Sequence, residues 1–111
     1  MFCNPVYDGS FADPQIIAVG NEYFAFATNG PLGNVQTLTS TDLVSWRQVG
    51  DALPSLPDWT APGRVWAPEV AVHAADRYVM YYTTRDLASG HQCVGVAVAS
   101  TPQGPYVDKS P

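Results

Sequence analysis

The chain has 111 residues, a length that corresponds to one small domain with a single hydrophobic core. Hydrophobic residues make up 46% of it and charged residues 14%, which excludes a disordered acidic tail. Ten acidic residues against five basic ones give a formal net charge of -5 without a basic cluster, which argues against nucleic acid and anionic membrane surfaces as partners.

The N-terminal residues 1–5 carry neither the basic nor the apolar stretch of a secretory signal, so the signal is either not used or missing from this chain. No apolar run approaches the roughly 20 residues of a membrane-spanning helix, so a membrane protein is not expected.

The two cysteines, Cys3 and Cys93, match no zinc or redox motif. We expect each to be a small buried thiol, with a disulfide between them as the alternative.

Short runs of aromatic and β-branched residues alternate with Gly, Pro, Asn and Asp along the whole chain, which is typical of strands and turns. No segment has the pattern of a helix. The sequence therefore predicts an all-β protein. The expected strands are residues 15–19, 23–28, 35–40, 46–49, 69–74, 78–83, 94–99 and 106–107.

The eight expected strands form two similar sets of four. Residues 14–19 (PQIIAV) align with residues 68–73 (PEVAVH), and residues 23–28 (YFAFAT) align with residues 78–83 (YVMYYT). A repeated four-stranded unit of this size is the pattern of a β-propeller blade.

Two blades do not close a propeller, because closed rings typically need about four to eight of them. An open pair leaves blade faces and strand edges exposed to water. We therefore expect an incomplete ring with one blade at about residues 13–52 and a second at about residues 65–108. An ordinary eight-stranded sandwich is the alternative.

Residues 53–63 (LPSLPDWTAPG) are rich in proline and connect the two units. Leu56 and Trp59 provide apolar anchors, so we expect an ordered crossover between blades. Residues 40–46 (STDLVSW) predict a tight turn in which an Asp is followed by a packed Trp.

The repeat separates what the fold requires from what it does not. Pro14 and Pro68 occupy equivalent positions, which indicates a shared turn before the innermost strand. The residue before each proline differs, being Asp13 in the first unit and Ala67 in the second. Asp13 is therefore a candidate functional residue at the mouth of a central channel, with an acceptor in an Asx-turn as the structural alternative.

Trp66, in the stretch WAPE at residues 66–69, is the second candidate, because an indole can stack on a sugar face. The alternative for Trp66 is packing between blades. Glu69 has an uncharged counterpart, Gln15, and a structural role is favoured for it. His73 and His91 have no neighbouring ligand cluster, so no metal and no cofactor is expected.

Several motifs together resemble the start of glycoside hydrolase family 43. They are NPV at residues 4–6, ADP at residues 12–14, STDLVSW at residues 40–46, WAPEV at residues 66–70 and TPQGPY at residues 101–106. The resemblance covers nearly the whole chain and implies a five-bladed β-propeller that hydrolyses arabinose- or xylose-containing polysaccharides or oligosaccharides with inversion.

The resemblance implies that Asp13 corresponds to the general base that activates water. The general acid Glu and an Asp that tunes its pKa come from later blades of the family, and this chain has neither; Glu69 belongs to the WAPE motif and is not a substitute. We therefore expect negligible turnover from the isolated chain. The resemblance also implies an extracellular location.

A non-catalytic alternative remains at this point. Two blades that bind carbohydrate through Trp66, or that close a ring by self-association, also agree with the pattern. In either case missing blades or further copies are needed to complete the propeller.

Overall fold

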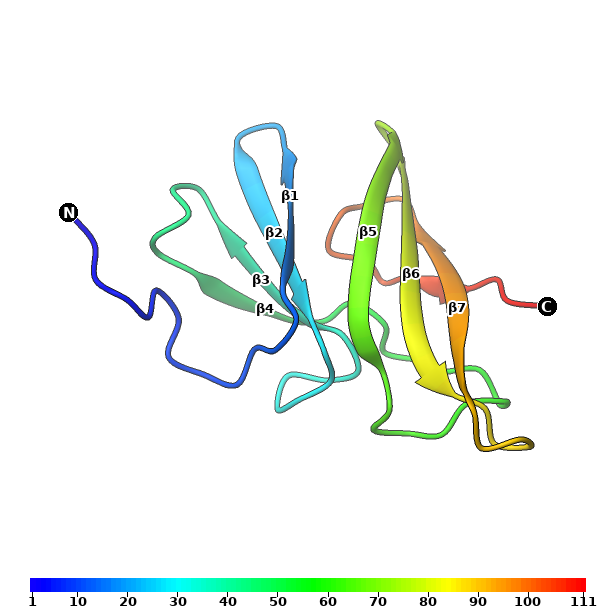
Figure 1. Cartoon of the computed structure of the whole chain (residues 1–111). Helices are drawn as coiled ribbons and strands as arrows, with labels where there is room; N and C mark the ends of the chain where they lie inside the picture. The colour runs from blue at the N-terminus through cyan, green and yellow to red at the C-terminus, as the bar shows by residue number, and fades with distance from the viewer.

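The computed structural model describes residues 1–111 and contains two four-stranded antiparallel sheets and no helix (Figure 1). The strands of the first sheet, in chain and spatial order, are β1 (Gln15–Val19), β2 (Glu22–Ala27), β3 (Gln36–Ser40) and β4 (Arg47–Asp51). Those of the second are β5 (Trp66–Ala74), β6 (Arg77–Arg85), β7 (Gln92–Ala99) and β8 (Val107–Asp108). The all-β prediction is confirmed.

Each sheet is built from four consecutive strands, with no strand exchanged between the sheets. This arrangement is that of propeller blades and differs from the Greek-key connections of the sandwich alternative. The innermost strands β1 and β5 lie side by side, and the chain termini lie at opposite ends of the molecule (Figure 1). The molecule measures 49 × 30 × 16 Å, so the two blades form an open slab with no closed ring.

The second sheet is longer than the sequence indicated. Strand β5 begins at Trp66 and strand β6 continues to Arg85, which pairs with Gln92 of β7. The reason lies in the following loop, where the Asp86 carboxylate accepts hydrogen bonds from the backbone N–H groups of Ala88 and Ser89. The residues near the end of the hairpin are polar, so the hydrophobic pattern of the sequence did not predict this extension.

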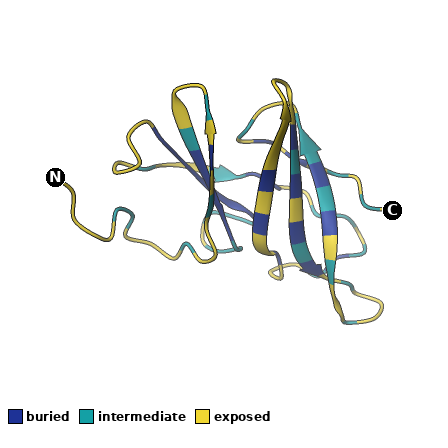
Figure 2. Ribbon diagram, turned by 45° about the horizontal axis from the view of Figure 1, so that its top comes forward, coloured by how far each residue is buried: buried dark blue, intermediate teal, exposed yellow.

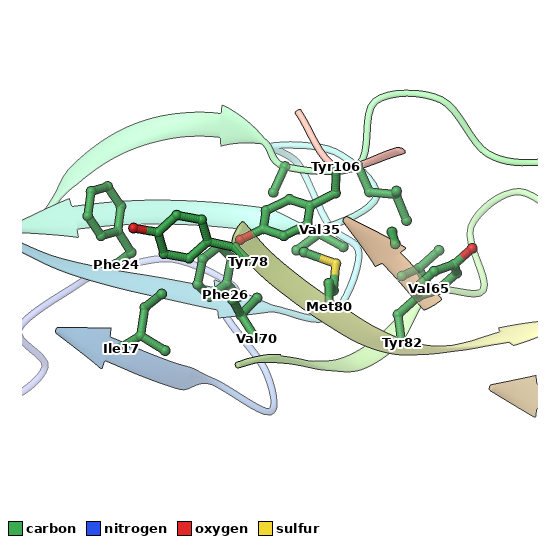
Figure 3. Close-up of a cluster of buried hydrophobic side chains, with 13 residues drawn as sticks. Ile17, Phe24, Phe26, Val35, Val65, Val70, Tyr78, Met80, Tyr82 and Tyr106 are labelled. Atoms are coloured by element: carbon green, nitrogen blue, oxygen red, sulfur yellow. The ribbon is translucent and has the colours of Figure 1, made fainter. Parts of the chain in front are cut away.

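The hydrophobic core lies between the two sheets. Buried side chains face each other there, as the dark segments of Figure 2 and the close-up in Figure 3 show. From the first sheet, Ile17, Phe24 and Phe26 contribute, and Val70 and Met80 come from the second. The packing of these apolar side chains is what holds the two units together.

Residues 53–63 connect the two sheets and are fastened to the second one. The N–H of Leu87 donates to the carbonyl of Trp59 at 2.8 Å, and the N–H of Ala61 donates to the carbonyl of Arg85 at 2.8 Å. Leu56 packs against the core. The predicted crossover with apolar anchors therefore agrees with the structure.

The turn at residues 40–46 is also as predicted. The Asp42 carboxylate accepts the backbone N–H groups of Val44 and Ser45 at 2.9 and 2.7 Å, and the indole N–H of Trp46 donates to the carbonyl of Leu43. These hydrogen bonds hold the ionised Asp42 and keep its pKa below the ordinary value.

The prediction for the cysteines was wrong. Cys3 is exposed and Cys93 is only partly buried, and both are free thiols. Cys3 lies in the N-terminal segment ahead of β1, outside the core, and Cys93 lies near the beginning of β7. The structure contains no helix able to cross a membrane.

Candidate active site

Asp13 lies immediately before β1, with its side chain exposed and with a positive φ of 52°. Its repeat counterpart Ala67 has a φ of 41°, so both units approach the innermost strand through the same left-handed residue before proline. L residues rarely adopt this conformation, and Asp tolerates it better than Ala. The strain therefore belongs to the shared turn, while the carboxylate is present only in the first unit.

Thr28, immediately after β2, connects these two positions. Its hydroxyl donates a hydrogen bond to Asp13 Oδ2 at 2.8 Å and accepts one from the N–H of Ala67 at 2.9 Å. The backbone N–H of Thr28 donates to the carbonyl of Ala12 at 3.1 Å. One threonine thus fixes the carboxylate relative to the beginning of the second blade.

The remaining oxygen of the Asp13 carboxylate, Oδ1, accepts no hydrogen bond from the protein, and no backbone amide donates to either oxygen. The Asx-turn that was the structural alternative is therefore not formed. An exposed carboxylate with one oxygen held and the other open to solvent can orient a water molecule and take its proton.

Trp66 lies at the same end of the innermost strands as Asp13. The N–H of Asn29 donates to the carbonyl of Val65 at 2.9 Å, which places the beginning of β5 against the end of β2. Trp66 is 40% exposed, so it is not buried between the blades.

Three other polar residues considered in the sequence are not part of this site. Glu69 is exposed on the second sheet, and His73 and His91 are exposed and apart from it. No group of three or more His, Cys, Asp or Glu side chains is placed to hold a metal ion.

Thr28 is the site residue that the sequence reasoning missed. A signal was present, because the second unit has a threonine, Thr83, at the same repeat position. Asp13 stood out because it differs from Ala67 in the second unit, whereas Thr28 is identical to Thr83 and therefore did not stand out.

The chain is similar to known glycoside hydrolases. The profile of Glycosyl hydrolases family 43 matches residues 2–111. An extracellular endo-alpha-(1->5)-L-arabinanase of Thermotoga petrophila is 33% identical over 109 residues, covering 85% of this chain and 22% of the relative. A non-reducing end alpha-L-arabinofuranosidase of Bacteroides ovatus is 31% identical over 114 residues, covering 96% of this chain and 21% of the relative.

A solved structure of a thermostable family-43 glycoside hydrolase superimposes with a TM-score of 0.86 at 28% identity, covering 99% of this chain and 36% of the other. The chain thus spans about a fifth of the length of the two curated relatives. The match extends over both sheets and over every motif described above. On this evidence the chain belongs to glycoside hydrolase family 43 and forms two blades of its β-propeller.

Proposed function

We propose that residues 13–52 and 65–108 are two blades of a glycoside hydrolase in which Asp13 is the general base. The substrate class is an arabinose- or xylose-containing polysaccharide or oligosaccharide, and hydrolysis inverts the anomeric centre. Relatives of this chain that are named as an arabinanase and an arabinofuranosidase support arabinose as the first sugar to test.

The observation that carries the proposal is the state of the Asp13 carboxylate. Thr28 holds one oxygen, and the other accepts no hydrogen bond from the protein. Trp66, which precedes Ala67 in the chain, is also exposed. The second repeat keeps the strained turn at Ala67 but has no carboxylate, so the fold does not need one there. A general base needs a carboxylate oxygen that is free to accept a proton from water, as Oδ1 of Asp13 is.

In the proposed step Asp13 takes a proton from a water molecule whose oxygen attacks the anomeric carbon. The glycosidic bond breaks, and the departing oxygen takes its proton from a second carboxylic acid. Inverting enzymes hold the two carboxyl groups roughly 6.5 to 9.5 Å apart so that water fits between base and sugar.

The chain does not supply the second carboxyl group. Glu69, two residues after Ala67, is part of the WAPE stretch and is no substitute for the proton donor. General acid catalysis contributes about 10² to 10⁴-fold in rate, so we expect negligible turnover from the isolated 111-residue chain.

Trp66 is proposed to bind a sugar ring by stacking, beside the carboxylate that activates water. Aromatic rings and sugar faces share apolar C–H surfaces whose burial is favourable. An extracellular location is part of the proposal, because its substrates are polymers outside the cell and the Thermotoga relative is named as extracellular.

The test is a chimera in which residues 1–111 replace the matching part of the Thermotoga arabinanase. Asp13→Asn in this chimera is expected to lower kcat on arabinan by about 10²-fold or more, because the amide cannot take a proton from water. Trp66→Ala is expected to raise KM more than it lowers kcat. Proton NMR of the first product formed reports whether the anomeric centre is inverted.

Asp8→Asn is the matched control, since Asp8 is an exposed acid in the same N-terminal segment and is expected to leave kcat unchanged. An Asp13→Asn chimera that keeps its kcat removes Asp13 from the role of base. Calorimetric binding of arabino-oligosaccharides to the isolated chain tests the non-catalytic alternative, which requires Trp66-dependent affinity without any blade from another protein.

A further inference from the structure

Gln36, the first residue of β3, is a polar side chain buried in the first blade. It is 2% exposed, and a buried amide without hydrogen-bond partners would destabilise the fold. The partners of this amide therefore explain why a glutamine lies there.

The amide nitrogen of Gln36 uses both of its hydrogens. Nε2 donates to the carbonyl of Ser10 at 2.9 Å and to the carbonyl of Thr28 at 3.0 Å. Two carbonyl oxygens can face only the NH₂ end of an amide, so these partners determine its orientation. The amide oxygen accepts the N–H of Leu32 at 3.4 Å. Gln36 thus connects two segments that are 18 residues apart in the sequence.

Both of these segments position Asp13. Ser10 belongs to the segment that leads directly into Asp13, and the Thr28 hydroxyl donates to Asp13 Oδ2 at 2.8 Å. The segments also bind each other, because the N–H of Thr28 donates to the carbonyl of Ala12 at 3.1 Å. The backbone of Thr28 is therefore held on two sides, by Ala12 at its N–H and by Gln36 at its carbonyl.

The direction of the Thr28 hydroxyl follows from its partners. The hydroxyl oxygen accepts the N–H of Ala67 at 2.9 Å, and the single hydroxyl hydrogen is directed at Asp13 Oδ2. Oδ2 is therefore occupied, and Oδ1 is the oxygen left to take a proton from water. A shift of the Thr28 backbone would move this donor and the Asp13 carboxylate with it.

The repeat shows that the fold does not require a glutamine at this position. Gln36 pairs with Ala27 in the first sheet. The repeat counterpart of Ala27 is Tyr82, which pairs with Gly95 in the second sheet. The second unit thus has a glycine where the first has Gln36, and the Tyr82 ring lies in the space beside it. The buried amide is present only in the unit that carries the carboxylate.

Gly30 makes room for this amide. A Cβ added to Gly30 would lie 2.4 Å from Gln36 Nε2, and the φ of Gly30 is not positive, so glycine is needed here for space. The repeat counterpart of Gly30 is Arg85. The first unit therefore differs from the second at Asp13, at Gln36 and at the residue that accommodates Gln36.

We propose that Gln36 is a positioning residue for general-base catalysis by Asp13. Gln36 makes no hydrogen bond to the carboxylate and acts through the carbonyls of Ser10 and Thr28. The inference rests on the proposed function of Asp13. A displacement of about 1 Å at a catalytic group, caused by a change outside the site, can lower the rate by as much as about 10²-fold.

The test uses the chimera with the Thermotoga arabinanase. Gln36→Met keeps an unbranched side chain and removes both N–H donors. We expect kcat on arabinan, per folded enzyme, to fall about tenfold. KM is expected to change less than about twofold, because a displaced base weakens an interaction that is made in the transition state.

A double variant separates positioning from general stability. The Asp13→Asn chimera has no base to position, so adding Gln36→Met to it is expected to leave the remaining kcat unchanged within about twofold. A further tenfold loss in the double variant would show that Gln36 acts on another part of the enzyme, and would overturn the inference.

Gly30→Ala displaces the Gln36 amide without deleting it, and replaces any Gln36→Met chimera that does not fold. The added Cβ meets the far end of a flexible side chain, so the blade can keep its structure while the amide moves. The same loss of kcat is expected. Far-UV circular dichroism checks the folding of each chimera.

Gln103→Met is the matched control and is expected to leave kcat unchanged. Gln103 is exposed in the turn after β7. This turn lies at the end of the second sheet opposite to Trp66, since Trp66 pairs with Thr83 near one end of β6 and Ala99 pairs with Tyr78 near the other.

The outcomes distinguish the two proposals. If Asp13→Asn keeps its kcat, there is no base to position, and the proposed function and the role of Gln36 are both overturned. If Asp13→Asn loses kcat while the folded Gln36→Met or Gly30→Ala chimera keeps it, only the role of Gln36 is overturned. An equal loss from Gln103→Met also overturns that role.

Discussion

The hydroxyl of Thr28 donates a hydrogen bond to Asp13 Oδ2 at 2.8 Å, and the Thr28 hydroxyl oxygen accepts the backbone N–H of Ala67 from the second blade at 2.9 Å. The orientation of the candidate base is therefore set by a contact between blades and not by β1 alone. A change in how the two blades pack at Ala67 is therefore expected to alter the position of the Asp13 carboxylate through the Thr28 side chain.

Thr28→Val keeps the shape of the side chain and removes its hydroxyl. It leaves the N–H of Ala67 without its acceptor and frees Asp13 Oδ2. We expect a loss of about 0.5 to 1.5 kcal/mol in the free energy of unfolding, which is the usual net contribution of a hydrogen bond, because water can reach both exposed partners. Urea titration followed by tryptophan fluorescence measures it.

Thr83→Val is the matched control, because Thr83 occupies the same repeat position and its hydroxyl has no protein partner. Its expected effect in monomeric protein is within about 0.5 kcal/mol. Equal losses from the two substitutions would mean that β propensity, and not the link between blades, determines the cost.

Gln15→Glu tests the amide that spans the junction. The carboxylate keeps the hydrogen bond from the N–H of Val70 but loses the donor and faces the carbonyl oxygen of Val70 instead. We expect a destabilisation of about 1 to 3 kcal/mol in thermal or urea unfolding. Glu69→Gln is the converse change at the equivalent repeat position of the second blade and is expected to be neutral, because Glu69 is exposed. A Gln15→Glu variant of unchanged stability would show that the two hydrogen bonds between the Gln15 side chain and the Val70 backbone contribute little to stability.

The sequence was sufficient for the architecture, because short runs of aromatic and β-branched residues separated by Gly, Pro, Asn and Asp predict strands and turns. The expected bounds of β1 coincide with the observed Gln15–Val19. The two-unit repeat then indicated which sheet each strand joins. Asp13 was found in the same way, since it is a charged residue where the other copy has Ala.

The sequence was not sufficient for contacts that join distant segments. Thr28 and Ala67 are 39 residues apart, and no local pattern marks a hydroxyl that bridges two blades. The exposure of Cys3 was missed for a related reason, because the burial of a thiol is decided by which segment covers it and not by its composition. Residue preferences are averages over such contexts.

Gly95 is expected to be essential to the packing of β7 against β6. It is buried and pairs directly with Tyr82, and a Cβ added to it would overlap the Tyr82 ring. That ring is buried and its hydroxyl donates to Asp108, so it has little room to move. We expect Gly95→Ala to destabilise the chain by about 1 to 3 kcal/mol in urea unfolding.

A double variant checks the cause. Tyr82→Leu shortens the opposing side chain, so adding Gly95→Ala to it is expected to cost less than Gly95→Ala costs alone. Additive losses would show that the effect of the alanine does not arise from the contact with Tyr82.

Asp42 is expected to make the stability of the first sheet depend on acid pH. Its carboxylate accepts the N–H groups of Ser45 and Val44 and the hydroxyl of Ser40, which favour the ionised form and lower its pKa from the ordinary 3.8. The unfolded chain then binds a proton at a higher pH than the folded chain, so this contribution is present above pH 3.8 and is lost as the pH falls through the lowered pKa.

Asp42→Asn keeps an acceptor oxygen but does not ionise. Its Tm is therefore expected to lie below that of the wild-type chain at pH 6, with the difference shrinking as the pH falls below 3.8. Asp86→Asn is expected to behave in the same way, because backbone and side-chain hydrogen bonds from Ser89 lower the pKa of Asp86. Melting curves recorded at a series of pH values by circular dichroism make the comparison. A constant difference across the series would show that the loop stabilises the fold through geometry alone, without any contribution from the charge of Asp42.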